Sequence, residues 1–248
     1  DSCGIAAGRT DNPIFSKEIS TENMQTVLFN STIFGPIHSR RLGSSLGVNL
    51  SPSDGKICSF DCLYCEAGYN AQGPGTSGLP ARTEVARMLD EKLAAMRAAG
   101  QGLDVITFWG NGEPTIHPDF AGIIDDTIAL RDKYFPQVKI SVLTNSTMLG
   151  RPQVVEALRK VDNNILKLDS AIERTVQLLD RPSLSYRLPK VIEQLAQFSG
   201  SGIIQTMITR GSHDGEAVDN STDEEIAALI EADRHINPRS IMIYSIDR

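Results

Sequence analysis

The sequence predicts an α/β fold, a partial (β/α)6 barrel that is open on one side. Short apolar segments of strand length alternate along the chain with segments of helical length. This alternation is typical of parallel strands joined by right-handed crossovers. Six such units are fewer than the eight that close a full barrel. No internal repeat is visible and no linker is long enough to divide the chain, so we expect one domain.

The six strands are expected at short apolar or alternating runs, which are residues 47–50, 105–108, 138–144, 164–169, 203–209 and 240–246. The run 203–209 is almost continuously apolar, as strands buried on both faces are. Within it, we expect Gln205 to face the interior of the barrel.

Six helices are expected from apolar residues at helical spacing, at residues 83–99, 119–134, 153–161, 173–179, 187–198 and 222–235. Thr83 is the expected N-cap of the first helix. Thr222 and Glu225 predict a capping box at the start of the last helix. Residues 211–220 are polar and acidic, and we expect a loop there, over the open face of the barrel.

The composition is that of an ordinary water-soluble globular protein, with 40% hydrophobic and 22% charged residues among 248. No stretch approaches the roughly 18 apolar residues of a membrane span, and no N-terminal segment resembles a secretion signal. The net charge of −7 weighs against a large nucleic-acid footprint, because phosphate contacts need clustered Lys and Arg. A local basic patch is still compatible with this charge.

We expect residues 1–32 to form a flexible N-terminal extension or tag, and residues 33–248 to form the core domain. Residues 1–23 are polar and aperiodic, and Met24 opens a more regular stretch. The last expected strand reaches the end of the sequence without an outer helix after it. We therefore expect the core domain to be incomplete at its C-terminal end.

Three of the four cysteines lie close together, with three residues between Cys58 and Cys62 and two between Cys62 and Cys65. Thiolates at this spacing suit a metal better than disulfides to distant partners. Closed zinc and iron–sulfur sites take four protein ligands, and no histidine lies beside these three. A 4Fe-4S cluster held by three thiolates would leave one iron open to a small molecule. A zinc knuckle is the alternative, and Cys3 is either a free thiol or a fourth ligand.

The Cys-x3-Cys-x2-Cys spacing, with Tyr64 directly before the last cysteine, resembles the cluster loop of the radical S-adenosylmethionine (SAM) superfamily. The run 34–50 resembles an uncharacterised Fe-S oxidoreductase branch of that superfamily, loosely related to the enzymes of wybutosine synthesis on tRNA. The resemblance implies a 4Fe-4S cluster whose open iron binds the amino and carboxylate groups of SAM. It also implies reductive cleavage of SAM to methionine and a 5′-deoxyadenosyl radical, which takes a hydrogen atom from a substrate.

A second motif, Gly110-Asn111-Gly112-Glu113, follows the expected strand 105–108. It resembles the Gly-Gly-Glu motif that grips the SAM amino group, with Asn111 in place of one glycine. Glu113 would then lie at the carboxyl end of a barrel strand, where chemistry takes place in such folds. A glycine turn with a surface glutamate is the alternative.

Other candidate residues also follow expected strands. The resemblance places Tyr64 by the adenine of SAM and implies SAM contacts for Asn145 and Ser146, although both can instead cap a turn. Lys167 and Asp169 share one face of the strand 164–169. The resemblance implies contacts of this pair with the ribose or carboxylate of SAM, and a mutual ion pair is the alternative.

The paired arginines Arg40 and Arg41 would hold a carboxylate or phosphate, or lie in a solvated turn.

The resemblance further implies an electron donor such as flavodoxin or ferredoxin. The substrate stays unidentified: a small molecule, a peptide or protein, or an RNA base. A low-potential cluster and few cysteines favour the reducing cytoplasm. Two other functions fit three clustered cysteines, an iron–sulfur electron-transfer protein and a zinc-stabilised binding module.

Overall fold

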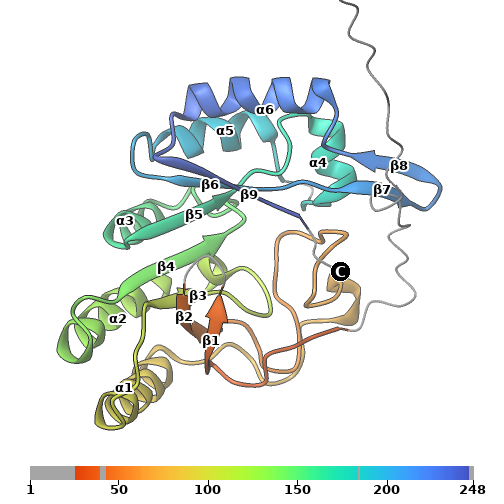
Figure 1. Cartoon of the computed structure of the whole chain (residues 1–248). Coiled ribbons are helices and arrows are strands. Elements are labelled where there is room, and N and C mark those ends of the chain that lie inside the picture. The colour runs from red at the N-terminus through yellow and green to blue at the C-terminus, as the bar shows by residue number, and fades with distance from the viewer. Residues whose placement is uncertain (1–25, 40–42, 184, 246–248) are drawn as a thin grey trace, which may run out of the picture.

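A computed structural model describes residues 26–39, 43–183 and 185–245 of the chain. Its main sheet has seven strands in the order β1-β2-β3-β4-β5-β6-β9. Neighbouring strands from β2 to β9 pair in parallel, and β1 pairs with β2 in the antiparallel direction. The six parallel strands confirm the predicted partial (β/α)6 barrel (Figure 1).

The parallel strands are β2 (Gly43–Val48), β3 (Val105–Phe108), β4 (Lys139–Thr144), β5 (Asn163–Lys167), β6 (Ile203–Met207) and β9 (Ser240–Tyr244). The helices are α1 (Arg82–Ala98), α2 (Phe120–Tyr134), α3 (Pro152–Lys160), α4 (Glu173–Leu179), α5 (Leu188–Ala196) and α6 (Asp223–Ile236), with 3-10 turns η3 (Asn70–Gln72) and η4 (Pro114–Ile116). Each expected strand and helix is therefore present, and most have shifted ends.

The sequence analysis missed strand β1 (Ile33–Ser39) and placed the following strand too late, at residues 47–50. The two strands lie close together because Gly47 has no side chain. A Cβ atom at Gly47 would lie 2.2 Å from the ring of Phe34. Glycine and serine are poor strand formers in isolation, so this pairing depends on tertiary packing and gives little local signal.

The expected loop at residues 211–220 is wrong, because β7 (Arg210–His213) and β8 (Glu216–Asp219) form an antiparallel hairpin. The turn residues Asp214 and Gly215 both have positive φ, at 52° and 78°. Two-residue hairpin turns of this kind favour Asp-Gly. The dipeptide was thus a hairpin signal in the sequence.

Only part of the expected helix capping is present. The side chain of Thr222 accepts a hydrogen bond from the amide of Glu225, so Thr222 caps α6 as predicted. The Glu225 carboxylate instead accepts from the hydroxyls of Ser170 and Thr175, so there is no capping box. Helix α1 begins at Arg82 with Ala81 at the N-cap position, so Thr83 does not cap it.

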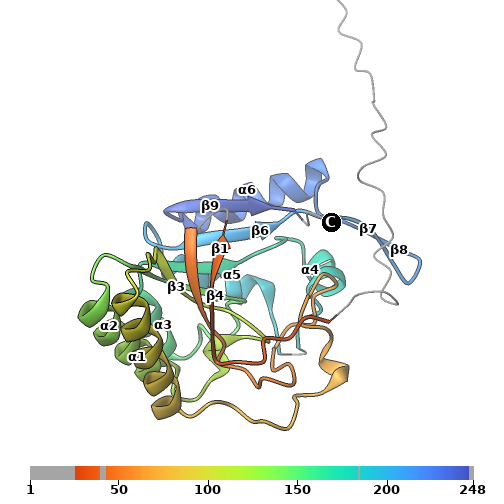
Figure 2. The ribbon, with the colours of Figure 1, turned by 60° about the horizontal axis from the view of Figure 1, so that its bottom comes forward.

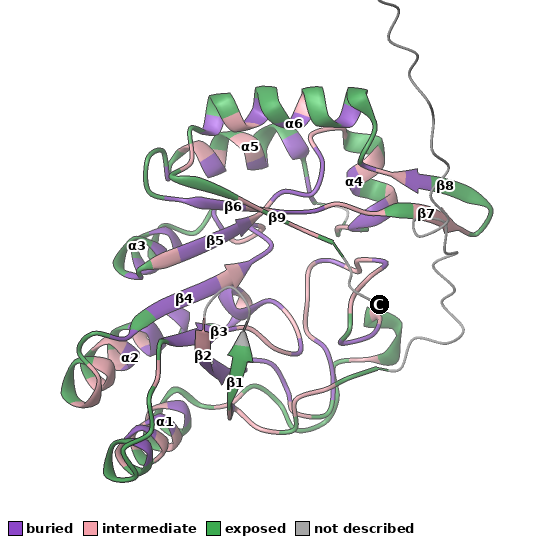
Figure 3. Cartoon of the chain, viewed as in Figure 1, coloured by how far each residue is buried: buried purple, intermediate pink, exposed green. Residues whose placement is uncertain are grey.

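The helices lie outside the curved sheet, and the apolar core fills the space between the two layers (Figures 1 and 2). Alternate strand residues such as Val48, Ile106 and Phe108 enter this core, and Figure 3 shows the burial along these strands. The residues between them point to the inner face, where polar pairs form. Ser45 and Thr107 hydroxyls lie 2.8 Å apart, and Asn163 donates to Ser141 at 2.9 Å. The inner face is therefore partly polar.

The described residues before β1 also pack on the domain. Phe29 stacks on Phe34 with ring centroids 4.0 Å apart, and it meets Trp109 edge-on at 4.8 Å. The amide of Val27 donates to the carbonyl of Glu66 at 2.8 Å. The packed body therefore includes residues before Ile33. Among the helices that the structure describes, none is both long and apolar enough to cross a membrane.

The pairing register of β6 with its neighbouring strands shows which face of the sheet Gln205 lies on. This residue pairs in register with Lys167 on β5 and with Met242 on β9. Residues in register on neighbouring strands share a face. Gln205 therefore lies on the inner face with Lys167, as the sequence predicts.

Substituting Phe108→Ala should destabilise the fold by about 3–5 kcal/mol, because the ring is fully buried and its removal leaves a cavity. The free energy of unfolding from urea titration measures the effect. Ile243→Ala is the control: this side chain is 66% exposed, so the change should be within about 0.5 kcal/mol. Equal losses in the two variants would show that the core is not where the structure places it.

Candidate functional site

The three clustered cysteines lie in the long connection between β2 and α1. Cys58, Cys62 and Cys65 are free thiols, and each is partly buried. The loop that carries them, residues 56–70, lies at the carboxyl edge of the parallel strands (Figure 1). We call this segment the cysteine loop.

One side of the cysteine loop docks on the turn after β3. The amide of Ile57 donates to the carbonyl of Asn111 at 3.3 Å, and the amide of Glu113 donates to the carbonyl of Ile57 at 3.0 Å. Gly112 makes this approach feasible, because a Cβ atom there would lie 2.0 Å from the Ile57 oxygen. Gly110 has φ of 153° and packs against Asn49. Gly112 thus has a packing role in holding the loop, and Gly110 allows the turn to pack against Asn49.

The other side of the loop docks on the end of α4. The amides of Asp61 and Leu63 donate to the carbonyls of Asp180 and Leu179 at 3.0 and 2.9 Å. The amide of Ser183 donates to the carbonyl of Ser59 at 2.9 Å. Leu63 is fully buried and packs with Leu179 and Val218. The backbone positions of the three cysteines are therefore fixed by contacts from outside the loop.

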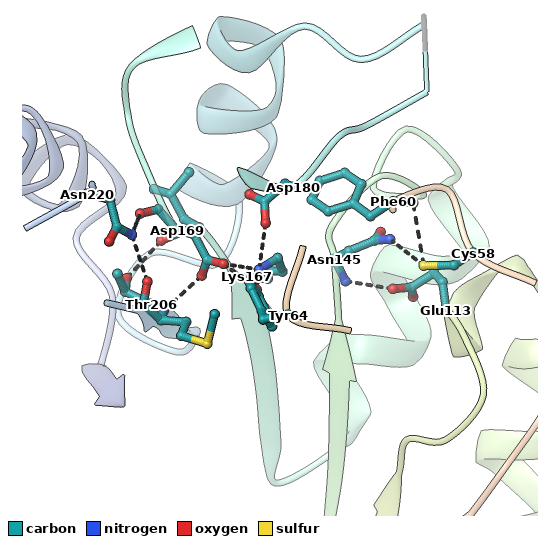
Figure 4. A network of polar contacts seen from close by, with 12 residues as sticks. Cys58, Phe60, Tyr64, Glu113, Asn145, Lys167, Asp169, Asp180, Thr206 and Asn220 are labelled. Atoms are coloured by element: carbon teal, nitrogen blue, oxygen red, sulfur yellow. Dashed lines mark hydrogen bonds and ion pairs between the residues drawn. The ribbon is translucent and has the colours of Figure 1, made fainter. Parts of the chain in front are cut away.

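Glu113 lies beside Cys58 and is almost completely buried (Figure 4). Its Oε1 atom accepts from the Thr115 amide at 3.0 Å and the Thr144 hydroxyl at 2.7 Å, and Oε2 accepts from the Asn145 amide at 2.6 Å. Burial raises the pKa of Glu113, although these hydrogen bonds oppose the shift. The carboxylate therefore has a fixed orientation, and the alternative of a surface glutamate is wrong.

Asn145 joins the end of β4 to the cysteine loop. Its side-chain nitrogen lies 3.5 Å from Cys58 Sγ and donates to Ser59 Oγ at 2.9 Å. Ser146 is fully buried with φ of 67°, and its hydroxyl has no hydrogen-bond partner. Thr147 donates to the Asn145 oxygen at 2.7 Å. Asn145 thus caps the following turn and also contacts a predicted cluster ligand.

A buried group of charges lies on the opposite side of the cysteine loop. Lys167 on β5 forms ion pairs with Asp169 and, at 2.9 Å, with Asp180, and it also contacts the hydroxyl of Tyr64. The Tyr64 hydroxyl donates to Asp169 (Figure 4). The mutual ion pair of Lys167 and Asp169, one of the two expectations, is therefore present. We call these four residues the charge cluster.

Asp180 is the member of the charge cluster that the sequence analysis missed. It follows α4 and is thirteen residues beyond Lys167 in the sequence, so no local pattern links the two. The only available signal was general: a lysine on the inner face of a strand needs carboxylate partners. Such a partner can come from any segment that the fold brings near.

Burial and neighbouring charges shift the pKa values of these groups. Burial favours neutral Lys167, but Asp169 and Asp180 outweigh it and raise the pKa of the ammonium above its ordinary value. Burial raises the pKa of Asp180 to about 7, and Lys167 opposes that shift. Burial also raises the pKa of the Cys58 thiol to about 12, with a further contribution from Glu113. Metal binding to such thiols must displace their protons.

The donor set at this site suits an iron–sulfur cluster. Thiolates are soft ligands, and clusters of this kind are held by cysteines. Among the described residues, no three His, Cys, Asp or Glu side chains converge closely enough to hold one metal ion. In a 4Fe-4S cluster each of the three thiolates would bind a separate iron.

A hollow in the sheet lies away from the cysteine loop. A cavity of about 540 Å³ at the amino ends of the strands is lined by residues such as Val105, Lys139 and Asn163. No predicted cluster or SAM residue lines this cavity. Chemistry in barrel folds takes place at the carboxyl ends of the strands. We therefore assign the candidate site to the edge that carries the cysteine loop.

A family model described as the radical SAM superfamily matches residues 53–174, a range that includes the cysteine loop and Glu113. The chain belongs to the radical SAM superfamily of enzymes. The UPF0026 protein of Helicobacter pylori strain 26695 is 29% identical over 220 residues, which are 87% of this chain and 66% of that protein. The chain thus spans slightly less than two thirds of this relative.

Two solved structures share the radical SAM fold with this chain. A radical SAM methyltransferase from Sphaerobacter thermophilus has a TM-score of 0.58 and 17% identity, covering 80% of this chain and 55% of that one. Native anSMEcpe with bound AdoMet has a TM-score of 0.55 and 14% identity, covering 80% of this chain and 51% of that one. These likenesses confirm the predicted fold class.

Within this superfamily fold, the structure brings most predicted site residues to one edge. Cys58, Tyr64, Glu113, Asn145, Lys167 and Asp169 all appear in the network of Figure 4. Their contacts with SAM stay predictions. Cys3, Arg40 and Arg41 lie outside the described residues.

Asn111 departs from the superfamily glycine pattern and has a clear structural role. It is fully buried, and its side chain donates to the carbonyls of Phe29 and Pro52, both at 2.9 Å. Its oxygen accepts from the Phe29 amide at 2.8 Å. Asn111 therefore fastens the segment before β1 to the turn that carries Glu113.

The Gly112→Ala variant should bind less iron than the wild-type protein. The added Cβ would meet the Ile57 oxygen at 2.0 Å, so the cysteine loop must move away from the β3 turn. Iron content after anaerobic reconstitution measures the effect. Gly102→Ala is a matched control, since its Cβ would meet nothing within 4 Å. Normal iron content in Gly112→Ala would show that docking of the loop is not required.

Lys167→Met should destabilise the fold by about 3–5 kcal/mol, because it leaves two buried carboxylates without their cation. Urea unfolding at pH 8 measures the loss, and the added change Asp180→Asn should recover part of it. Lys160→Met is the control: its ion pair with Asp125 is exposed and is worth at most about 1 kcal/mol. A loss for Lys167→Met no larger than for the control would contradict the charge cluster.

Proposed function

We propose that this chain is the catalytic core of a radical SAM enzyme, an Fe-S oxidoreductase that cleaves SAM reductively with a 4Fe-4S cluster. The main supporting observation is the placement of three free thiols in one loop at the carboxyl edge of the sheet, with Cys58 beside Glu113 and Asn145. Superfamily membership supports the same chemistry, and one structural neighbour was solved with AdoMet bound.

Cys58, Cys62 and Cys65 would hold the cluster as thiolates. When bound, the cluster supplies an electron to SAM, which breaks into methionine and a 5′-deoxyadenosyl radical. The chain itself fixes the thiolates through the docking of Ile57 on one side and of Asp61 and Leu63 on the other. These contacts orient the ligands before any cofactor arrives.

Glu113 would accept the amino group of SAM. Its Oε1 atom already accepts three hydrogen bonds, from the amide and hydroxyl of Thr115 and from the Thr144 hydroxyl. Its Oε2 atom accepts one, from Asn145. A carboxylate oxygen has two lone pairs, so Oε2 can accept a further hydrogen bond from an ammonium. The positive charge would also offset the burial of this carboxylate.

Tyr64 would lie by the adenine, and the charge cluster fixes its ring. The hydroxyl contacts Lys167 and Asp169, so the ring cannot turn freely between Cys62 and Cys65. Lys167 and Asp169 form an ion pair with each other. A contact of either residue with the ribose would therefore use an atom that is not part of this ion pair.

The substrate of the proposed reaction is a small molecule, a peptide or protein side chain, or an RNA base, from which the radical takes hydrogen. Flavodoxin or ferredoxin would supply the electron in the cell. A low-potential cluster persists best in a reducing compartment, so we propose that the protein works in the cytoplasm.

Cys62→Ala should abolish production of 5′-deoxyadenosine, because the remaining two thiolates cannot hold the cluster. The assay uses anaerobically reconstituted protein with dithionite and SAM, and chromatography measures the nucleoside. Cys3→Ala is the control and should retain the wild-type yield. Loss of activity in Cys3→Ala would identify this thiol as a fourth ligand.

Two outcomes would contradict the proposed function. A colourless protein that binds zinc in place of iron would indicate a zinc-stabilised binding module. A cluster whose spectrum does not change when SAM is added would indicate an electron-transfer protein.

A further inference from the structure

Lys56 is buried to an unusual degree for a lysine, with 4% of the residue exposed. Lysine is almost never fully buried unless its charge is paired. The ammonium donates to the Gly68 carbonyl at 2.8 Å and to Asp61 Oδ1 at 3.2 Å.

The partners of Lys56 span all three cysteines. Lys56 precedes Cys58, Asp61 lies between Cys58 and Cys62, and Gly68 follows Cys65. One ammonium therefore joins the start, the middle and the end of the cysteine loop.

A second residue reinforces this arrangement. The amide of Asn70 donates to Asp61 Oδ1 at 2.8 Å, and its side chain donates to the carbonyls of Cys58 and Phe60 at 3.3 and 3.1 Å. Asp61 Oδ1 is thus shared by Lys56 and Asn70. The loop is closed by internal hydrogen bonds as well as by its external docking.

The position of Lys56 also has an electrostatic consequence. Its ammonium lies inside the loop that carries the three thiols, and it forms an ion pair with Asp61 at 3.2 Å. Charges interact more strongly in a protein interior than in water. Replacing a buried ion pair by well-packed apolar residues is often neutral or stabilising, so stability alone does not explain this lysine.

We propose that Lys56 is a positioning residue that closes the cysteine loop and whose positive charge raises the reduction potential of the bound cluster. The inference rests on the proposed function, because it requires a cluster. A cluster becomes more negative when it takes up an electron. A nearby cation therefore stabilises the reduced form, and a nearby anion such as Asp61 stabilises the oxidised form.

Because Lys56 and Asp61 carry opposite charges, removing each one should shift the reduction potential of the cluster in the opposite direction. Lys56→Met removes the cation and keeps the length of the side chain. Asp61→Asn removes the anion and keeps an oxygen that can accept from Lys56 and Asn70. Lys56→Arg keeps the positive charge. Lys160→Met, an exposed lysine in a surface ion pair, is the matched control.

The reconstituted variants are poised at the midpoint potential of the wild-type cluster, and electron paramagnetic resonance measures the reduced fraction. We expect the ratio of oxidised to reduced cluster to rise at least tenfold in Lys56→Met and to fall at least tenfold in Asp61→Asn. A tenfold change corresponds to about 59 mV for a one-electron couple. Lys56→Arg and Lys160→Met should stay close to the wild-type ratio.

Shifts in the same direction for Lys56→Met and Asp61→Asn, or no shift in either, would overturn the electrostatic role. If Lys56→Met binds no iron, this result supports the role of Lys56 in closing the loop. The reduction potential of the cluster in Asp61→Asn then tests the electrostatic role: a higher potential than in the wild type supports it, and an unchanged potential overturns it. If the wild-type protein itself assembles no cluster, the proposed function fails rather than this inference.

Discussion

The cysteine loop depends on backbone docking to two separate parts of the barrel. Three thiols within one short segment cannot fix their own positions, because the described residues 56–69 form no helix or strand and have no apolar core of their own. The β3 turn holds Ile57 on one side, and the end of α4 holds Asp61 and Leu63 on the other. Because Gly112 lies against the Ile57 carbonyl, the motif that carries Glu113 is also the surface on which the loop rests. The positions of the three thiols and the position of the Glu113 carboxylate are therefore coupled.

Much of the fold was predictable, because parallel strands covered by helices leave a strong periodic pattern. The strand at 105–108 and the helix at 173–179 have the predicted bounds. The errors fall where tertiary packing outweighs local preference. Strand β1 and the start of β2 form because Gly47 accommodates the ring of Phe34, and no local propensity encodes that contact. The β7–β8 hairpin is different, since its Asp-Gly turn was visible in the sequence and was not used.

The candidate site was predictable to the extent that its chemistry lies in short motifs. The cysteine spacing and Glu113 stood out, and the structure brings Glu113 beside Cys58. Asp180 and Lys56 were missed for different reasons. The course of α4 places Asp180 beside Lys167, and no spacing of residues in the sequence predicts this contact. Lys56 lies next to the motif, but lysines are usually solvated, so only its burial in the folded chain singles it out.

We propose that three thiolates hold a 4Fe-4S cluster and leave one iron open for SAM. Mössbauer spectroscopy of protein reconstituted with ⁵⁷Fe tests this claim most directly, by recording spectra before and after addition of SAM. We expect one iron site of the 4Fe-4S cluster to change its Mössbauer parameters on SAM addition, while the other three sites stay unchanged. A spectrum that is identical with and without SAM, or one without a cluster of this type, would contradict it.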